Sequence, residues 1–260
     1  MLPYLSRRPL TLVRCLDGHT GECFFQKHAA AGFPDEVMRV PITEADGTAI
    51  CVAVDSTVGL LSLIQLGTLE LHAWGSRLER LEHPDELVFD LDPDPHLPFG
   101  VVNDAARLLR TALEAAGLHS YVTTTGGKGL HVVTPLEPTR TWHEVKAFAR
   151  GLANALAKAD PEHYTASMSK RRRAGKVFID YLRNSRGATF IVPYSTRRHA
   201  GAPIATPLRW DELTPSLRSD RYGLPNIRRR LAGLKSDPWE GFHDARRPIT
   251  GRAMRSVGAA

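Results

Sequence analysis

Two short apolar segments that each lead directly into aspartate constrain this chain more than any other feature of its sequence. Residues 87–89 (LVF) are followed by Asp90 and Asp92, and residues 177–179 (VFI) are followed by Asp180. A short apolar run of this kind predicts a buried strand, in which residues two apart project to the same face. We therefore expect the three carboxylates to meet at the ends of two neighbouring strands.

Three converging carboxylates indicate a particular kind of chemistry. Carboxylate oxygens are the ligands that hard divalent cations take in proteins. Two such cations can hold the attacking and leaving oxygens of a phosphoryl transfer. The pattern therefore predicts a metal-dependent enzyme that acts on phosphate groups.

The charge distribution agrees with a polyanionic substrate. The 260 residues include 34 Lys+Arg and 28 Asp+Glu, a net charge of +6 that permits nucleic-acid binding without establishing it. Acidic residues concentrate at 79–94, whereas basic residues gather in four short runs at 170–173, 197–198, 228–230 and 246–247. A basic surface beside an acidic focus is what a metal-dependent enzyme acting on nucleic acid needs.

Cysteine usage and the N-terminus indicate the compartment. Cys15, Cys23 and Cys51 form no CxxC pair and no zinc-like spacing, so we expect reduced thiols. The first residues lack the apolar core of a signal peptide, and the most apolar stretch, 58–66, is too short to span a bilayer. We expect a cytoplasmic protein without a membrane partner.

The periodicity of the chain predicts an α+β fold. Helices are expected at 58–65, 101–116, 142–159 and 226–234, with Ser56 and Thr141 as N-caps of the first and third. A hairpin is expected over residues 10–26 around Asp17–Gly18, and a second one joins strands 176–182 and 188–192. Strict βαβ alternation is missing, which disfavours a doubly wound parallel sheet. We predict one domain over residues 1–248 and a disordered tail over 249–260.

A glycine-rich turn, TTTGGKGLH at residues 123–131, lies between two predicted strands. Gly126 and Gly127 let the turn expose backbone N–H groups to an anion, while Thr125 adds a hydroxyl and Lys128 a positive charge. The spacing is not that of a Walker A loop. An ordinary hairpin turn is the alternative, and the upstream aspartate pair favours a phosphate site.

Other basic residues are candidates for phosphate contact. Arg173 precedes the third aspartate in a basic run, and Arg197 lies in a loop after the next strand. A solvated surface is the alternative for such runs. Taken alone, Lys27 and His72 are more typical of a surface lysine and a structural histidine.

A set of motifs in a fixed order identifies a resemblance over about residues 8–240. The chain closely resembles the polymerase domain of bacterial DNA ligase D, a member of the archaeo-eukaryotic primase superfamily. The motifs are FFQKH, ELHAW, LVFDLDPD, TTGGKGLH, MSK with GKVFIDYLRN, and PYS with GAPIATPLRWDEL.

The resemblance implies a two-lobed primase-polymerase fold around a modified RNA-recognition-like sheet. It implies a nucleotidyltransferase that extends a primer 3′-hydroxyl with NTPs or dNTPs, prefers ribonucleotides, and uses two Mn²⁺ or Mg²⁺ ions. The expected setting is bacterial non-homologous end joining on gapped DNA or DNA ends, at the nucleoid, with a DNA ligase and Ku as partners.

The family's functional residues carry over onto matching positions. Asp90, Asp92 and Asp180 match the metal-binding carboxylates, and His72 matches a histidine near the catalytic centre. Lys27 matches a lysine that binds the 5′-phosphate across a gap. The expected nucleotide-binding residues are Thr125, Gly126, Gly127, Lys128, Arg173 and Arg197.

Three departures from the family pattern bear on these expectations. Arg183 stands where glutamine is common, His199 stands where arginine is common, and the N-terminal segment is short. A non-catalytic DNA-end-binding module is the alternative function. A phosphatase with a nucleophilic aspartate is disfavoured, because Pro93 and Asp94 follow Asp92 where that class has threonine or valine.

Overall fold

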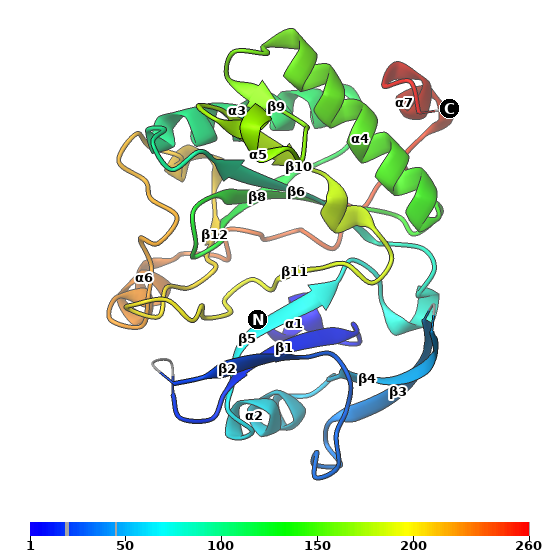
Figure 1. Ribbon diagram of the computed structural model, residues 1–260, viewed down its shortest axis with the longest axis vertical. Helices are drawn as coiled ribbons and strands as arrows, with labels where there is room; N and C mark the ends of the chain where they lie inside the picture. The colour runs from blue at the N-terminus through cyan, green and yellow to red at the C-terminus, as the bar shows by residue number, and fades with distance from the viewer. Residues whose placement is uncertain (19–20, 45, 260) are drawn as a thin grey trace.

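Two layers of β-sheet dominate the molecule, with the larger helices packed on their outer sides (Figure 1). The computed structural model describes residues 1–18, 21–44 and 46–259. Within these ranges each sheet contains six strands. The mixed α+β architecture with flanking helices is as predicted.

The first sheet is antiparallel throughout its pairings. Its order is β11-β5-β1-β4-β3, and β2 pairs with β1 outside this path. Its strands are β1 (Leu10–Cys15), β2 (Cys23–Gln26), β3 (Met38–Glu44), β4 (Gly47–Ala53), β5 (Thr68–Trp74) and β11 (Thr189–Ile191).

The second sheet has the order β12-β7-β8-β6-β10-β9 and is mixed, because β9 runs parallel to β10 while the other pairs are antiparallel. Its strands are β6 (Glu86–Pro93), β7 (Tyr121–Thr124), β8 (Leu130–Pro135), β9 (Tyr164–Thr165), β10 (Val177–Asp180) and β12 (Pro207–Leu208).

Two long helices cover the outer face of the second sheet, and a shorter one lies on the outer side of the first (Figure 1). The helices are α1 (Leu2–Leu5), α2 (Thr57–Gln65), α3 (Phe99–Ala115), α4 (Trp142–Ala159), α5 (Lys170–Arg173), α6 (Ile227–Gly233) and α7 (Gly251–Ser256), with 3-10 turns η1 (Leu78–Arg80), η2 (Leu182–Asn184) and η3 (Trp210–Glu212). Among the described residues, none of these helices combines the length and the apolar character that crossing a bilayer requires.

The predicted helix starts are confirmed by their caps. The Ser56 hydroxyl accepts a hydrogen bond from the Gly59 N–H at the start of α2. Thr141 and Glu144 form a reciprocal capping box at the start of α4, which satisfies two N–H groups that the first turn leaves without helical partners.

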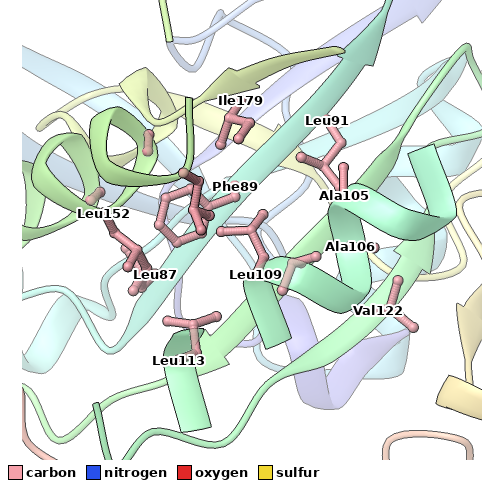
Figure 2. Packing of buried hydrophobic residues seen from close by; sticks show 14 of the residues in the cluster. Leu87, Phe89, Leu91, Ala105, Ala106, Leu109, Leu113, Val122, Leu152 and Ile179 are labelled. Carbon is pink, nitrogen blue, oxygen red and sulfur yellow. The ribbon is translucent and has the colours of Figure 1, made fainter. Parts of the chain in front are cut away.

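The alternation of side chains in β6 divides the strand between two cores. Leu87, Phe89 and Leu91 pack against helices α3 and α4 in one cluster (Figure 2). Val88 faces the other way and belongs to a second cluster, with residues of the first sheet. Because the period of a strand is two, Asp90 and Asp92 project from the same face as Val88, toward the first sheet.

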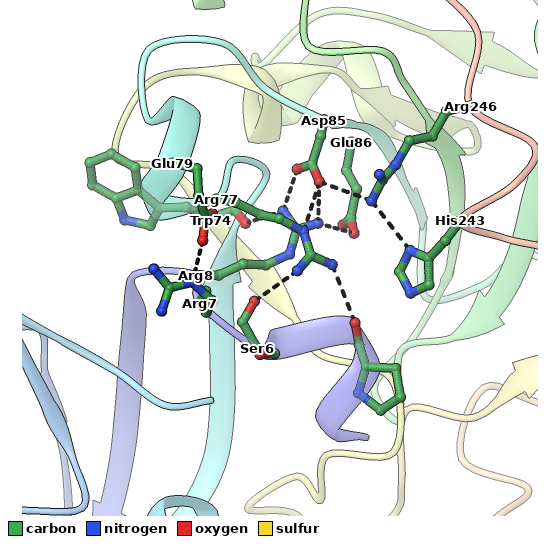
Figure 3. Close-up of polar contacts among 11 residues, drawn as sticks. Ser6, Arg7, Arg8, Trp74, Arg77, Glu79, Asp85, Glu86, His243 and Arg246 are labelled. Atoms are coloured by element: carbon green, nitrogen blue, oxygen red, sulfur yellow. Dashed lines mark hydrogen bonds and ion pairs between the residues drawn. The ribbon is translucent and has the colours of Figure 1, made fainter. Parts of the chain in front are cut away.

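A buried ionic network lies where β6 begins (Figure 3). The Arg8 guanidinium is completely buried and donates to both carboxylate oxygens of Asp85, at 2.6 and 2.9 Å, and to Glu86 at 2.7 Å. Arg77 adds a further contact to Asp85 at 3.2 Å. Arginine suits this position because its planar fork can serve two carboxylates at once.

The hairpin predicted for residues 176–192 is wrong. β10 pairs with β6 in the second sheet, whereas β11 pairs with β5 in the first, so the connection crosses between the sheets. Asn184 in this connection is buried, and its side-chain amide both accepts from the Val88 N–H (2.8 Å) and donates to the Val88 carbonyl oxygen (2.7 Å). It thereby occupies the place beside β6 that a longer β10 would take.

The prediction of three reduced cysteines is also wrong. Cys15 and Cys23 form a disulfide across the β1–β2 hairpin, where they are directly opposed in register. The hairpin itself, expected around Asp17–Gly18, is confirmed on the described residues. Cys51 is a free, buried thiol.

The disordered tail predicted for residues 249–260 is contradicted for most of its length. Ile249 is buried, and α7 begins with the Thr250 hydroxyl as N-cap and buries Ala253 and Met254. The contact with α4 is close, since a Cβ at Gly151 would lie 2.4 Å from the Val257 carbonyl oxygen. The tail is ordered because a glycine on α4 leaves room for its backbone. Residue 260 lies outside the described residues.

Candidate active site

Three neighbouring strands of the second sheet place charged side chains in a row facing the first sheet. In the register of the sheet Asp180 on β10 lies opposite Asp90 on β6, which lies opposite His131 on β8. Asp92 follows on the same face of β6, opposite Phe178. The predicted convergence of the three carboxylates is therefore what the strand pairing produces.

Cationic side chains surround this row. The Arg183 guanidinium lies 3.3 Å from an Asp90 carboxylate oxygen and 3.9 Å from one of Asp180. The His131 Nε2 is 3.5 Å from Asp90, and Arg173 is 3.8 Å from Asp92. Arg173 also stacks over the Phe178 ring, with its guanidinium carbon 3.6 Å from the ring centroid, which holds it beside the strand.

The carboxylates differ in how well their charge is balanced. Burial acts to raise the pKa of Asp90, but His131 and Arg183 outweigh it, so the pKa lies below its ordinary value. Burial raises the pKa values of Asp92 and Asp180, and the negative charge of Asp90 raises both further. The ionised forms of Asp92 and Asp180 are thus less favourable in this row than they would be in water.

An unbalanced set of carboxylate oxygens fits the metal chemistry expected from the sequence. Hard divalent cations take oxygen ligands, and a cation among Asp90, Asp92 and Asp180 would relieve their repulsion.

The glycine-rich turn joins β7 to β8 beside this row. Gly126 has a φ of +65°, and a Cβ there would lie 2.8 Å from the Arg197 side chain. A Cβ at Gly129 would lie 1.8 Å from the Leu91 carbonyl oxygen, so only glycine lets the turn pack onto β6. The Thr125 hydroxyl donates to the Gly129 carbonyl oxygen (3.1 Å) and accepts from the Gly127 N–H (3.2 Å). Thr125 therefore shapes the turn from within, and Lys128 is the side chain that the turn offers to a ligand.

The first sheet supplies the opposite wall. His72 on β5 is 2.9 Å from Glu70, a buried carboxylate that also lies 3.3 Å from Arg197. The Arg198 N–H donates to the other oxygen of Glu70 at 2.8 Å. Burial lowers the pKa of His72 despite its bond to Glu70, which favours the neutral ring. Glu70 thus fixes the direction of both cavity-facing side chains, His72 and Arg197.

The two walls enclose a cavity of about 330 Å³. Among the predicted residues, those that line it are His72, Asp90, Asp92, Thr125, Gly127, Lys128 and Arg197. Asp180, Arg173 and Gly126 adjoin these residues. Lys27 lies apart, in a second cavity of about 400 Å³ with Trp74 and Arg186.

Sequence reasoning missed four residues of the site. Glu70 lies two residues from His72 on the same face of β5, and His131 lies opposite Asp90 in register. These relations to expected cavity residues are the signal that would have found them. Arg183 and His199 line the cavity at positions noted only as departures from the motif.

Comparison with known proteins agrees with this geometry. The polymerase domain from Mycobacterium tuberculosis Ligase D in complex with DNA is a solved structure that matches with a TM-score of 0.88 and 32% sequence identity, covering 94% of this chain and 87% of that chain. A model of the family described as LigD, primase-polymerase domain matches residues 1–239. The chain belongs to this family, which confirms the resemblance seen in the sequence.

Two curated relatives show how much of a longer protein the chain matches. The multifunctional non-homologous end joining protein LigD of Pseudomonas aeruginosa is 38% identical over 259 residues, 99% of this chain and 31% of the relative. The bifunctional non-homologous end joining protein LigD of Bacillus subtilis is 32% identical over 232 residues, 89% of this chain and 37% of the relative. The chain spans about a third of the length of these relatives.

Proposed function

We propose that this chain, over residues 1–248, is a metal-dependent nucleotidyltransferase that adds nucleotides to primer 3′-hydroxyl ends, with ribonucleotides preferred. The observation that carries the proposal is the register of Asp180, Asp90 and Asp92 on one face of adjacent strands, opposite a wall that presents Arg197. The setting that the relatives suggest is gap filling and end processing in bacterial end joining, at the nucleoid in the cytoplasm, alongside a ligase and Ku.

Asp90, Asp92 and Asp180 are the residues that would hold the cations, two Mn²⁺ or Mg²⁺ ions. Such ions, when bound, supply the charge that activates a 3′-hydroxyl and neutralises a leaving pyrophosphate. The remaining work, positioning and charge neutralisation of the triphosphate, falls to side chains of this chain.

The triphosphate site is proposed to consist of groups from both walls. Lys128 and the Gly126 N–H approach from the second sheet, and Gly127, whose N–H is bonded to Thr125, gives the turn its shape beside the phosphates. Arg197 and Arg173 add guanidinium groups that suit phosphate oxygens. Thr125 maintains the turn. His72, held by Glu70, is placed to contact the nucleotide from the first sheet as a neutral hydrogen-bonding group.

Lys27 is proposed to bind the 5′-phosphate on the far side of a gap. Its separate cavity also contains Arg186, so two cationic residues are present where a phosphate would bind. This cavity shares no lining residue with the cavity at the carboxylates, as expected for a substrate that extends beyond the reacting nucleotide.

One observation favours the second candidate function, a DNA-end-binding module without catalysis. Arg183 already pairs with Asp90 and Asp180, so its guanidinium stands where a cation would bind. The Arg183 side chain is 43% exposed, however, so it can move into solvent and leave its two carboxylate partners to a divalent cation.

A primer-extension assay tests the proposal. The substrate is a labelled primer in a short gap with a downstream 5′-phosphate, with Mn²⁺ and either NTPs or dNTPs. Asp90→Asn is compared with Asp104→Asn, which changes an exposed aspartate on α3. Extension by the wild type and Asp104→Asn but not by Asp90→Asn is the expected result, and NTPs should be used better than dNTPs.

The alternative predicts a different outcome. If wild-type protein shifts gapped DNA and melts cooperatively but extends no primer with either metal, the nucleotidyltransferase is excluded and the end-binding function is favoured.

A further inference from the structure

A second group of metal-ligand side chains lies outside the carboxylate row. His28, Glu44 and Cys51 each present one ligand atom, and these three atoms all lie within 4.8 Å of one another. Cys51 is buried, Glu44 is partly buried and His28 is exposed. The proposed polymerase chemistry uses none of them.

The first sheet builds this group from three segments that are separate in the sequence. His28 follows β2 and forms an isolated antiparallel bridge with Cys51 on β4. The Ala29 N–H donates to the Ile50 carbonyl oxygen at 2.7 Å, which fixes that pairing. Side chains directly opposed in an antiparallel pair have Cβ atoms about 5 Å apart. Glu44, at the end of β3, reaches the same point.

The distances are close to those of a zinc site. The His28 Nε2 is 3.5 Å from a Glu44 carboxylate oxygen, and the Cys51 Sγ is 4.0 Å from the same oxygen. In tetrahedral zinc coordination the corresponding ligand atoms lie about 3.3–3.6 Å apart, given Zn–N, Zn–O and Zn–S bonds of about 2.0–2.3 Å. We propose that His28, Glu44 and Cys51 bind a zinc ion in the first sheet.

The ligand set distinguishes this site from the carboxylate row. A thiolate and an imidazole favour zinc, whereas three carboxylates favour Mn²⁺ or Mg²⁺. The cavity beside Glu44 and Cys51 shares no lining residue with the one at Asp90, and it belongs to the other sheet. Binding of zinc here is therefore independent of the carboxylate row, although the site borders the cavity in which Lys27 is proposed to bind a 5′-phosphate.

The surroundings of Cys51 suit a bound metal better than a reactive thiol. Cys51 is only 3% exposed, whereas reactive cysteines are partly accessible to solvent. Ile42, Trp74 and Trp142 pack in the same cluster and keep the sulfur side of the site apolar. On binding zinc the thiol proton leaves to solvent, and the thiolate with the Glu44 carboxylate balances the charge of the ion.

Two cationic side chains lie near the site and affect which ligand could occupy the fourth coordination position of the zinc ion. Arg186 already makes a bidentate pair with Glu82, with contacts of 2.8–3.0 Å. Lys27 lines the adjacent cavity together with Glu44 and Cys51. Three protein ligands leave a fourth coordination position, and beside Lys27 that position suits water or an anionic oxygen.

Direct metal analysis tests the site. Purified full-length chain is loaded with zinc, dialysed against zinc-free buffer containing excess Mg²⁺, and measured for bound metal by elemental analysis. Cobalt is then substituted, because a thiolate ligand produces a charge-transfer absorption that a site of oxygen ligands does not. The variants are Cys51→Ser and His28→Gln, with His143→Gln on the exposed face of α4 as the matched histidine control.

We expect about one zinc per chain in the wild type and in His143→Gln, with the cobalt–thiolate absorption, and loss of both in Cys51→Ser and His28→Gln. A Cys15→Ser/Cys23→Ser double variant should retain both signals, since its cysteines lie outside the site. Absence of the cobalt–thiolate band in folded wild-type protein, or its loss in the double variant alone, would overturn the proposal. Asp90→Asn should keep its zinc, which separates this site from the catalytic one.

Discussion

The two ends of strand β6 deal with buried negative charge in opposite ways. At the start of the strand Asp85 and Glu86 are bonded to the buried guanidinium of Arg8 (Figure 3). At its end Asp90 and Asp92 line an open cavity, and burial, followed by the charge of Asp90, raises the pKa of Asp92. One strand thus carries a network whose hydrogen-bond partners lie inside the protein and a pair of carboxylates that an external cation could reach. The carboxylates at the start of the strand are expected to stabilise the fold, and those at its end are proposed to bind a ligand.

The largest effect is expected where the internal network is broken. Arg8→Met leaves two buried carboxylates without their shared partner, and removing one member of a buried ion pair costs about 3–5 kcal/mol. Urea unfolding followed by circular dichroism measures the loss. Arg209→Met, at an exposed position in the cap of η3, is the control and should change little. A loss below about 1 kcal/mol for Arg8→Met would mean that the network does not stabilise the fold.

The reverse result is expected near the other end of β6, at Asp180 on β10, which lies opposite Asp90. Asp180→Asn should reduce primer extension about 100- to 1,000-fold, the range seen when one charge-stabilising group is removed from an active site. Its melting temperature should stay the same or rise, because a repulsive charge has been removed. Parallel melting and extension assays measure both, and a drop in melting temperature would contradict the contrast between the two ends.

Lys27 probes a phosphate contact away from the carboxylates. Lys27→Met should lower the preference for a 5′-phosphorylated gap about tenfold, as loss of one charge-assisted hydrogen bond implies. Binding to gapped DNA with and without the phosphate is compared by fluorescence anisotropy, with the exposed Lys235→Met as control. An equal loss for both DNAs would assign Lys27 to general backbone binding.

A smaller effect is expected in the pH dependence of stability, through Glu86 in the network around Arg8. Burial, opposed by Arg8, raises the pKa of Glu86 to about 7. The folded protein therefore holds the proton on the Glu86 carboxyl more tightly than the unfolded chain does. The stability that this protonated carboxyl contributes is complete below the pKa of the unfolded chain and is lost as the pH rises through about 7. The contribution should fall by about 1 kcal/mol per pH unit between roughly pH 5 and 7. Glu86→Gln, which keeps an acceptor for Arg8, should flatten this slope in unfolding titrations; an unchanged slope would assign it to other groups.

The smallest effect concerns Arg183, the cationic side chain beside the proposed metal site. Arg183→Gln removes a positive charge beside Asp90 and Asp180, so the Mn²⁺ concentration for half-maximal extension should fall a few-fold. Arg110→Gln on α3 is the control. A higher requirement for Mn²⁺ in Arg183→Gln would show that the arginine assists the site instead of competing with the metal.

The sequence predicted features that depend on neighbouring residues. The alternation in LVFDLDPD correctly indicated that Asp90 and Asp92 share a face, and the caps at Ser56 and Thr141 set the helix starts. The separation of β10 from β11 was not predictable in the same way, because two apolar runs around a turn have the same pattern whether or not they pair. The disulfide depended on the register of a hairpin, and α7 depended on a glycine on a distant helix.

The site shows the same division. Residues within a recognisable motif could be proposed from the sequence, and the carboxylates and the glycine turn lie at or beside the cavity, as expected. Glu70 was missed because its role, holding His72 and Arg197, exists only once a loop after β11 returns to β5. The pairing of Arg183 with Asp90 likewise depends on the chain leaving β10 toward the other sheet.

That departure has a consequence for movement. The connection from β10 to β11 is anchored to β6 by Asn184, and Arg186 in the same connection is bonded to Glu82 in the segment that joins β5 to β6. Two of the three crossings between the sheets are therefore tied together, and the third runs from β11 to β12. Because this third segment contains Arg197, which lines the cavity, any rotation of one sheet against the other would also displace a cavity side chain.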